Sequence, residues 1–446
     1  MAADPPPSQE FTAKGRATRE RVLSSAAQVL LSEGLSGFNL EKVRHAAAVS
    51  GSQLSHYFAD RPALIRGILD RQIEVVLDFH RQPKLGGLDT FDDFERWADA
   101  NLRYLRAIGY ASPTYHTLAG QLAKADAETR QTLADGYWRW VALLEQSFQR
   151  MVDRGVLVTT AQPRHLALVV VAAHQGAGTM AFAYRQEWPL VDVTSFIVNY
   201  LRTFAVDPAE RTPRKPRRPR LRTVRDNSAA SAGGDTRLTD KGLATRARII
   251  ERAAGLMFER GVHATSLADV RKASGVSGSQ LSHYFTDKRD LIRHVIALRT
   301  DDVVRLHTQP SLGQLDSLRA LRAWTDVCMA DVERVYLRGG CVYGSLTGEL
   351  LEADAGTLDY LAAGYDRWIA LFRNGLRVMR RRGDLTESAD PRHLAGSLVA
   401  AHQGGTLLTY ATGTAEPLQA VLNAAIDYVE SFRPTSRAAG VGTRRP

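Results

Sequence analysis

The chain has 446 residues, a formal net charge of +10 and 44% hydrophobic residues. At roughly 150 residues per domain, this length predicts two to four folded units. Only Cys328 and Cys341 are present, which excludes a disulfide framework and a multi-cysteine zinc site and is typical of a reducing compartment. We therefore expect a cytoplasmic protein with no metal site and no cofactor.

The positive charge is concentrated in two segments. Residues 207–241 hold ten Lys/Arg against five Asp/Glu, and residues 433–446 hold four Arg and no acid. Since the remainder is close to neutral, the overall charge is weak support for nucleic-acid binding. The most apolar run, 166–173, ends at His174 and Gln175, short of the ~20 residues that span a bilayer. No membrane segment is expected, and the N-terminal residues do not resemble a secretory signal.

An internal repeat sets the predicted architecture. The segment GSQLSHYF occurs at 51–58 and again at 278–285, an offset of 227 residues. After one single-residue insertion the offset becomes 228, which pairs Trp140 with Trp368 and residues 172–176 with 400–404. Two long copies predict a duplicated pair of domains, since a solenoid has shorter and more numerous repeats.

The repeat and the composition together predict domain boundaries. A segment mixing Pro/Arg with Ser/Ala/Gly separates the copies, and a flexible coil of about 36 residues spans roughly 33 Å, enough for the copies to dock side by side. The predicted order is a disordered tail at 1–13, a DNA-binding domain at 14–62, a helical regulatory domain at 63–205, a linker at 206–240, a second DNA-binding domain at 241–289, a second regulatory domain at 290–433, and a basic disordered tail at 434–446.

Each copy begins with elements in the spacing of a helix-turn-helix. A first helix with apolar residues at helical intervals is interrupted at Gly34 or Gly261. A short amphipathic helix follows (40–47; 267–273), and a second helix opens at Ser50 or Ser277 and would enter the major groove. Thr18 and Thr245 are predicted N-caps of the first helix that either meet a DNA phosphate or act only as caps.

The sequence resembles the TetR family of bacterial regulators through TRERVL, TRARII and the two GSQLSHYF segments. The resemblance implies an all-α fold with two TetR-like units, each a three-helix DNA-binding domain followed by a helical effector-binding and dimerisation domain, arranged as an intramolecular pseudo-dimer. It implies base contacts from Ser52, Gln53 and Ser55 and from Ser279, Gln280 and Ser282. It further places near phosphates, or packed beside them, His56, Tyr57 and Arg61 and their counterparts His283, Tyr284 and Lys288.

Two features of the reading segments follow from residue chemistry. A glutamine amide can pair with adenine N6 and N7, so Gln53 and Gln280 are the main candidates for base readout; the alternative is a glutamine solvated beside the groove. The turn before the second helix has Ala48 in copy one and Gly275 in copy two. If that position needs a positive φ, alanine costs about 1 kcal/mol and weakens the first copy.

The resemblance also implies that the last two helices of each copy dimerise, here 164–184 with 191–203 and 392–409 with 418–431. Small residues in 172–178 and 400–405 would let these helices approach closely. The dipeptides His174–Gln175 and His402–Gln403 lie inside these stretches, and we favour an interface role for them over a ligand pocket.

Effector-pocket candidates are aromatic and histidine residues at helical spacing, for which core packing is the alternative. They are Tyr115, His116, Trp138, Trp140 and His174 in copy one and Tyr343, Tyr365, Trp368 and His402 in copy two. Cys341 is either a redox sensor or a buried structural thiol.

These features predict a ligand-responsive repressor that binds a near-palindromic operator with two fused helix-turn-helix domains. The expected partners are double-stranded DNA, an unknown small-molecule effector, and the two copies themselves, with further self-association as a second possibility. A transcriptional activator and a protein–protein scaffold are the alternatives, while the chain has no phosphate-loop, nucleophile-elbow or zinc-protease motif. The run Lys215–Arg220 either enters a minor groove or is merely solvated.

Overall fold

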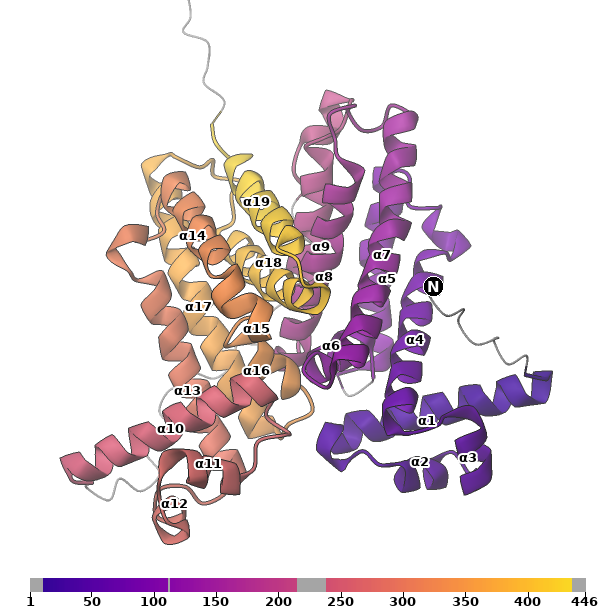
Figure 1. The fold of residues 1–446 in the computed structure, drawn as a ribbon. Coiled ribbons are helices and arrows are strands. Elements are labelled where there is room, and N and C mark those ends of the chain that lie inside the picture. The colour runs from indigo at the N-terminus through magenta and orange to yellow at the C-terminus, as the bar shows by residue number, and fades with distance from the viewer. Residues whose placement is uncertain (1–10, 111–112, 215–237, 435–446) are drawn as a thin grey trace, which may run out of the picture.

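The computed structural model describes residues 11–110, 113–214 and 238–434 and is built from α-helices (Figure 1). Within these residues the only β feature is an isolated bridge between Leu157 and Ala205. The predicted all-α class is therefore confirmed for the described chain.

The N-terminal half (11–214) opens with three helices, α1 (Ala13–Gly37), α2 (Leu40–Ala46) and α3 (Gly51–Tyr57), which we call the first head. Each helix has a polar N-cap residue whose side chain accepts a hydrogen bond from a backbone N–H of the first turn. These N-cap residues are Thr12, Asn39 and Ser50 respectively. Gly34 interrupts α1 with φ 66°, as predicted. The helices enclose a small core of Val22, Leu23, Ala26, Leu30, Phe38, Val43, Leu54 and Phe58.

Helix α4 (Arg61–His80) leads from the first head into a helical bundle. Asp60 caps α4, so the predicted boundary between residues 62 and 63 falls within its first turn. The bundle continues with η1 (Pro83–Leu85), α5 (Phe91–Ile108), α6 (Tyr115–Leu122), α7 (Ala127–Asp153), α8 (Pro163–Tyr184), α9 (Trp188–Arg202) and η2 (Pro208–Arg211).

The C-terminal half (238–434) repeats this order. Its second head consists of α10 (Asp240–Arg260), α11 (Leu267–Ser274) and α12 (Gly278–Tyr284). The bundle that follows comprises α13 (Lys288–His307), η3 (Pro310–Leu312), α14 (Leu318–Ala330), the π-helical η4 (Val332–Tyr336), α15 (Leu337–Gly339), α16 (Gly344–Glu349), α17 (Ala355–Arg382), α18 (Pro391–Thr412) and α19 (Glu416–Glu430).

The two halves pack against each other through α8 and α18, and both heads lie at the same end of the molecule (Figure 1). A Cβ atom on Gly176 would lie 1.9 Å from the carbonyl oxygen of Ala400, and one on Gly404 would lie 1.8 Å from that of Ala172. This contact is reciprocal, because each glycine of one helix meets the corresponding carbonyl of the other. Only glycine allows the two backbones to approach so closely.

Other small residues of these two stretches have different neighbours. Gly178 faces the ring of His116 within the N-terminal half, and Gly405 faces Leu418 and Val421 of α19. The predicted close helix approach therefore holds at Gly176 and Gly404, while Gly178 and Gly405 serve packing within their own halves.

Part of the predicted linker is ordered. Residues 207–214 are described, and Asn199 holds Arg214 by accepting its backbone N–H at 2.8 Å and donating to its carbonyl at 2.8 Å. At the far end Thr239 caps α10. Side-chain caps and amide hydrogen bonds therefore hold the described residues at both ends of the predicted 206–240 linker. The basic run Lys215–Arg220 lies outside the described residues.

Helix α8 is long and apolar enough to cross a membrane by length and composition alone, with a mean hydropathy of 1.5 over its most apolar window. The helix continues past His174 and Gln175, where the predicted apolar run ended. Of that window, 94% is buried inside the protein, so its apolarity is that of a helix in the protein core.

Candidate nucleic-acid interface and ligand cavity

The two predicted recognition helices share one local structure. In α3 the Ser50 side chain accepts the N–H of Gln53 at 3.1 Å, and the Gln53 Oε1 accepts the N–H of Ser50 at 2.9 Å. Ser277 and Gln280 form the same reciprocal pair at 3.1 and 2.8 Å. This capping box is encoded by the S-x-x-Q spacing, a signal that the sequence analysis did not use.

The capping box changes how a glutamine would read a base. The Gln Oε1 already accepts one hydrogen bond with one of its two lone pairs. An adenine N6–H would have to donate to the second lone pair, while both Nε2 hydrogens remain available to donate. Gln53 and Gln280 are exposed. The remaining exposed side chains of the same face are Ser52, Ser55, Ser279 and Ser282, while Leu54 and Leu281 are buried.

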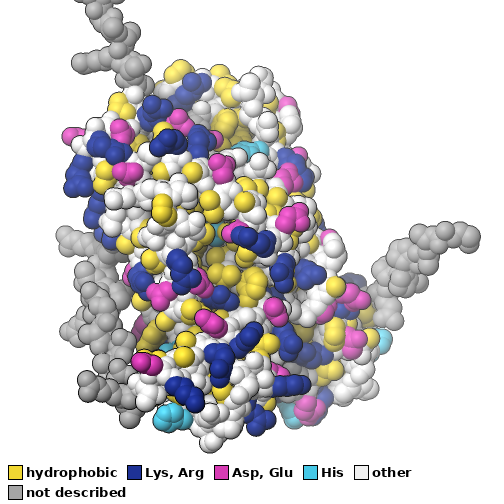
Figure 2. All heavy atoms as spheres, turned by 60° about the vertical axis from the view of Figure 1, so that its left-hand side comes forward, with side chains coloured by type: hydrophobic (Ala, Val, Ile, Leu, Met, Phe, Trp, Pro, Cys, Tyr) yellow, Lys and Arg dark blue, Asp and Glu magenta, His cyan; other side chains and the backbone are white. Residues whose placement is uncertain are grey.

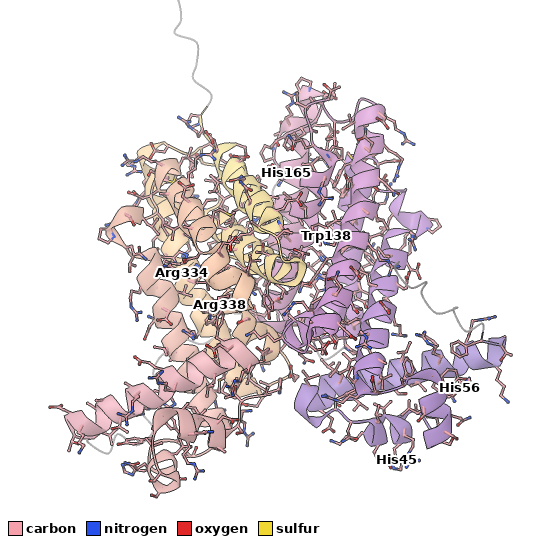
Figure 3. All side chains as sticks on the ribbon, in the orientation of Figure 1. His45, His56, Trp138, His165, Arg334 and Arg338 are labelled. Atoms are coloured by element: carbon pink, nitrogen blue, oxygen red, sulfur yellow. The ribbon has the colours of Figure 1, made fainter. Side chains whose placement is uncertain are left out.

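The residues predicted near phosphates divide into two groups. His56 and His283 are exposed and Tyr57 and Tyr284 are half-buried; Figure 3 shows His56 and His45 on the outer side of the first head. The other group points inward, because the Arg61 guanidinium donates to the carbonyls of Phe38 and Leu35, and Lys288 Nζ donates to the carbonyl of Val262 at 2.8 Å. Arg61 and Lys288 thus adopt the packing alternative in this structure.

The predicted capping role of Thr18 and Thr245 is wrong. Helix α1 begins at Ala13 and α10 at Asp240, so both threonines lie inside their helices. Their hydroxyls donate to the carbonyls of Lys14 and Lys241 at 3.0 and 2.9 Å. The helices start six residues earlier than predicted, after Thr12 and Thr239, whose side chains accept the backbone N–H of Gly15 and Gly242.

Exposed cations surround the second head, and Figure 2 shows Lys and Arg side chains at this end of the molecule. They include Lys241, Arg248, Arg271, Lys272 and Arg289. The first head exposes Lys14, Arg16, Arg21 and Lys42. Cations around a recognition helix are the groups that position a protein on the phosphate backbone.

The turn before each recognition helix confirms the predicted backbone strain. Ala48 has φ 49° and Gly275 has φ 64°. No atom lies within 4 Å of a Cβ built on Gly275, so any cost of a side chain there comes from the left-handed backbone and not from crowding.

We expect Ala48→Gly to raise the free energy of unfolding by about 0.5 to 1 kcal/mol, because glycine relieves the left-handed strain and loses only part of that gain to chain entropy. Gly275→Ala should lower it by a similar amount. Thermal denaturation of both variants checks this pair. Equal effects of the same sign would mean that backbone strain is not the cause.

A cavity of about 80 Å³ lies in the N-terminal bundle between α4, α5, α6, α7 and α8. Its polar end is a chain of hydrogen bonds, from His116 Nε2 to His174 Nδ1 at 2.9 Å and from His174 Nε2 to Asn101 Oδ1 at 2.9 Å. His80 lies beside it, with Nδ1 bonded to the Val76 carbonyl at 2.7 Å. The apolar walls include Val76, Phe79, Leu105, Ile108, Ala181, Phe182 and Leu190.

Several predicted pocket residues meet at this cavity. Tyr115, His116, Trp140 and His174 line it. The favoured interface role of His174 is wrong, because its ring points into its own half and bonds to Asn101. Trp138 does not line the cavity: its ring lies 5.0 Å from the Arg164 guanidinium, and Arg164 in turn pairs with Glu416 of the C-terminal half at 2.8 Å.

Comparison with known families identifies the C-terminal half. Residues 249–295, from α10 into α13, match the family described as bacterial regulatory proteins, tetR family. Residues 317–425 match the tetracyclin repressor-like C-terminal domain. Residues 249–425 form a TetR-family regulator domain. TetR-family proteins are helix-turn-helix transcriptional regulators and not enzymes, as the sequence predicted.

Individual relatives cover only parts of this chain. The HTH-type transcriptional repressor KstR2 of Rhodococcus jostii is 30% identical over 78 residues, which are 18% of this chain and 38% of that repressor. A TetR transcriptional regulator from Chloroflexus aurantiacus is 23% identical, with 43% and 96% of the two chains covered and a TM-score of 0.38. The regulatory protein TetR from Rhodobacter sphaeroides is 21% identical, with 41% of this chain and 98% of that chain covered and a TM-score of 0.37. At these values neither structure bears on the operator or the ligand.

In the TetR-family domain the predicted pocket residues are packed core. Tyr343 donates to the Leu361 carbonyl at 2.5 Å, Trp368 to His307 at 3.0 Å, and Tyr365 to Gln403 at 2.9 Å. His402 Nε2 bonds to the Tyr336 hydroxyl at 3.1 Å. Core packing was the alternative in the sequence analysis. Burial also raises the pKa of Cys341, which favours the structural thiol over a redox sensor.

The buried histidines of both bundles make stability depend on pH. Burial lowers the pKa of His80 and His116 to about 4 and that of His402 to about 3, from an ordinary value of 6.5. Between pH 6.5 and 4 the unfolded chain therefore binds more protons than the folded one, and stability falls as the pH is lowered through this window.

We expect the melting temperature to be nearly constant above pH 6.5 and to fall by several degrees between pH 6.5 and 4.5. Differential scanning calorimetry across this range checks the expectation. His80→Asn should reduce the slope. A slope unchanged by this variant would show that His80 does not contribute to the acid sensitivity.

Proposed function

We propose that the chain is a ligand-responsive repressor that binds a near-palindromic operator with both heads of one polypeptide. The observation that carries the proposal is the identical segment GSQLSHYF on α3 and α12, capped in the same way and exposing the same Ser, Gln and Ser side chains. Two copies of one reading surface at one end of a molecule fit an inverted repeat with half-sites about one helical turn apart.

The proposal treats the N-terminal half as a second TetR-like unit, so that the chain is a pseudo-dimer. Support comes from the contact across the centre, where Gly176 meets Ala400 and Gly404 meets Ala172. These pairs are related by the same offset of 228 residues as the repeat itself. Such reciprocity is the mark of an isologous interface.

Repression would come from occupying promoter DNA, and an effector would act by binding one arrangement of the two heads more tightly than another. In this account one chain forms the complete DNA-binding unit in the cytoplasm, so further self-association is not needed. An activator would occupy the same operator and differ only in the outcome of transcription assays.

Selection of bound genomic fragments by the purified chain, at fixed salt, tests the proposal. We expect an enriched inverted repeat. Gln53→Glu and Gln280→Glu retain the capping-box acceptor but remove the amide donors, so each should lose discrimination at one half-site by about tenfold or more. Gln53→Ala and Gln280→Ala test the same donors without adding charge.

Gln146→Ala, an exposed glutamine of α7, is the matched control and should bind as the wild type. If no motif is enriched and binding only weakens with salt, the specific regulator is refuted and a scaffold with non-specific DNA affinity is favoured.

A further inference from the structure

The two halves differ in the residues around the N-terminal cavity. Around the N-terminal cavity, Asn101, His116 and Gly178 correspond through the repeat to Cys328, Gly344 and Thr406. In the C-terminal half the equivalent histidine, His402, bonds to the Tyr336 hydroxyl at 3.1 Å, whereas His174 bonds to Asn101.

Tyr336 reaches this position through the single-residue insertion that shifts the repeat from 227 to 228. The insertion is accommodated in the π-helical segment η4, where the N–H of Tyr336 donates to the Asp331 carbonyl five residues earlier at 3.2 Å. A π turn holds one residue more than an α turn. Tyr336 is 4% exposed, and its counterpart by the offset of 228 is Ile108, which lines the N-terminal cavity. An aromatic side chain thus occupies the region that the cavity occupies in the first half.

The hydrogen bonds of the N-terminal cavity have a fixed direction. Asn101 Nδ2 donates to the Trp97 carbonyl at 2.8 Å, so its Oδ1 accepts from His174 Nε2. A neutral imidazole carries one N–H, so His174 Nδ1 accepts from His116 Nε2. His116 Nδ1 is then an acceptor, and among the described residues none is found to donate to it.

Burial keeps these rings uncharged, since it lowers the pKa of both His116 and His174. None of the described residues lining the cavity is an Asp, Glu, Lys or Arg. A charged ligand would lose its hydration without gaining a partner. The walls therefore fit an apolar, uncharged molecule with one hydrogen-bond donor.

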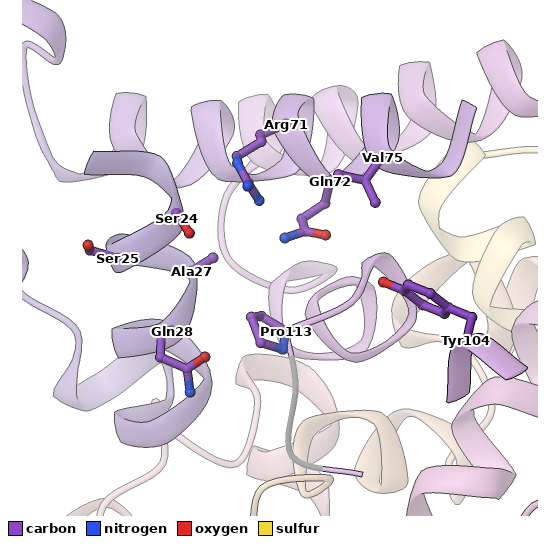
Figure 4. Close-up of a pocket in the computed structure, with 9 residues that line it drawn as sticks. All are labelled: Ser24, Ser25, Ala27, Gln28, Arg71, Gln72, Val75, Tyr104 and Pro113. Carbon is purple, nitrogen blue, oxygen red and sulfur yellow. The ribbon is translucent and has the colours of Figure 1, made fainter. Parts of the chain in front are cut away.

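An outer cleft of about 490 Å³ leads toward this cavity from the junction of α1 and α4 (Figure 4). Gln72, Val75 and Tyr104 line both spaces. The cavity alone is smaller than the roughly 150 Å³ that accommodates benzene. A ligand with one aromatic ring would therefore extend past Tyr104 into the cleft, where the guanidinium of Arg71 is already paired with Glu20.

We propose that the chain binds one small uncharged hydroxyl compound, a phenol or an alcohol, per polypeptide, in the N-terminal half only, with its hydroxyl donating to His116 Nδ1. The regulatory meaning of this site rests on the proposed repressor function, but binding itself does not. A ligand held against α4 and α6 contacts α4, the helix that connects the first head to the bundle.

Calorimetric titration of the full chain without DNA tests the proposal, with 4-methylphenol as the probe. We expect one molecule bound per chain. Its methyl ether, which cannot donate, should bind at least tenfold more weakly, and benzoate and benzylamine should show no binding. His116→Phe should remove the preference for the phenol over the ether.

Matched variants exchange the residues Ile108 and Tyr336, which correspond to each other in the two halves. Ile108→Tyr places a tyrosine side chain in the N-terminal cavity, as Tyr336 does in the C-terminal half, and should abolish binding. Ile108→Val is the control that keeps the cavity open. Tyr336→Ile should leave the N-terminal site unchanged. Circular dichroism and thermal melting of each variant verify its folding.

Two phenols bound per wild-type chain, binding that survives in folded Ile108→Tyr, equal affinity for phenol and ether, or no binding of the phenol would each overturn the proposal. Operator binding by the ligand-free chain is measured separately. If it is intact while phenol binding fails, the ligand inference is refuted and the repressor function stands.

Discussion

Gly176→Ala is expected to destabilise the protein by about 3 kcal/mol or more, at the upper end of overpacking costs. The ideal Cβ would lie 1.9 Å from the Ala400 carbonyl oxygen and 2.8 Å from the backbone N of Gly404. Both neighbours are backbone atoms of α18, so a flexible side chain cannot move aside to relieve the contact. The helices α8 and α18 must separate, and the packing between the two halves is lost with them.

Chemical denaturation measures the loss, and Gly404→Ala should match it because the contact is reciprocal. Gly255→Ala is the control: Gly255 lies within α10 with no atom within 4 Å of a built Cβ, and the change should stabilise by up to about 1 kcal/mol. We also expect Gly176→Ala to weaken binding to an inverted repeat more than binding to an isolated half-site. Wild-type stability in this variant would show that the two helices do not meet as described.

Glu349→Ala is expected to cost about 3 to 5 kcal/mol, the range for breaking a buried ion pair. Glu349 in α16 and Lys124, just after α6, form an ion pair at 3.1 Å with side chains 4% and 6% exposed. Glu349 Oε2 also accepts the N–H of Val262 at 2.6 Å, at the end of α10. Lys124 Nζ lies 5.2 Å from the Phe258 ring centre. The pair thus fastens the N-terminal bundle to the second head.

A double-mutant cycle separates the pair from its surroundings. Lys124→Met and Glu349→Leu together should cost less than the sum of the two single losses, because two apolar side chains leave no unpaired buried charge, although the Val262 N–H still loses its acceptor. Additive losses would show that the two residues do not interact. We also expect the double variant to bind DNA with altered sensitivity to half-site spacing, since the link between bundle and head is changed.

Much of the fold was predictable because the residues that set it are local signals or repeated ones. Gly34 interrupts α1 and Gly261 ends α10, both at positive φ, and Ala48 and Gly275 share a left-handed turn. The repeated His80, Trp97 and Trp140 are a buried hydrogen-bonded group, in which both indoles donate to His80 Nε2 at 3.0 and 3.2 Å. Apolar periodicity and the repeat predict such positions without any structure.

The candidate sites were only partly predictable, because they depend on which face of a helix meets which neighbour. His174 was assigned to the interface from its place among small residues, yet Gly176, two positions later, faces α18 while His174 faces Asn101. The sequence also left open whether both halves have a ligand pocket. The sequence shows one inserted residue. Its effect, which is to turn Tyr336 toward His402, is seen only in the π turn of the structure.

The most direct test of the central claim is the mass of the protein–DNA complex, measured by native mass spectrometry on a duplex containing the selected inverted repeat. If one polypeptide supplies both reading heads, the complex contains one chain per duplex, and a duplex with a single half-site is bound much more weakly. Two chains on each inverted repeat, with one head of each contacting DNA, would contradict the account.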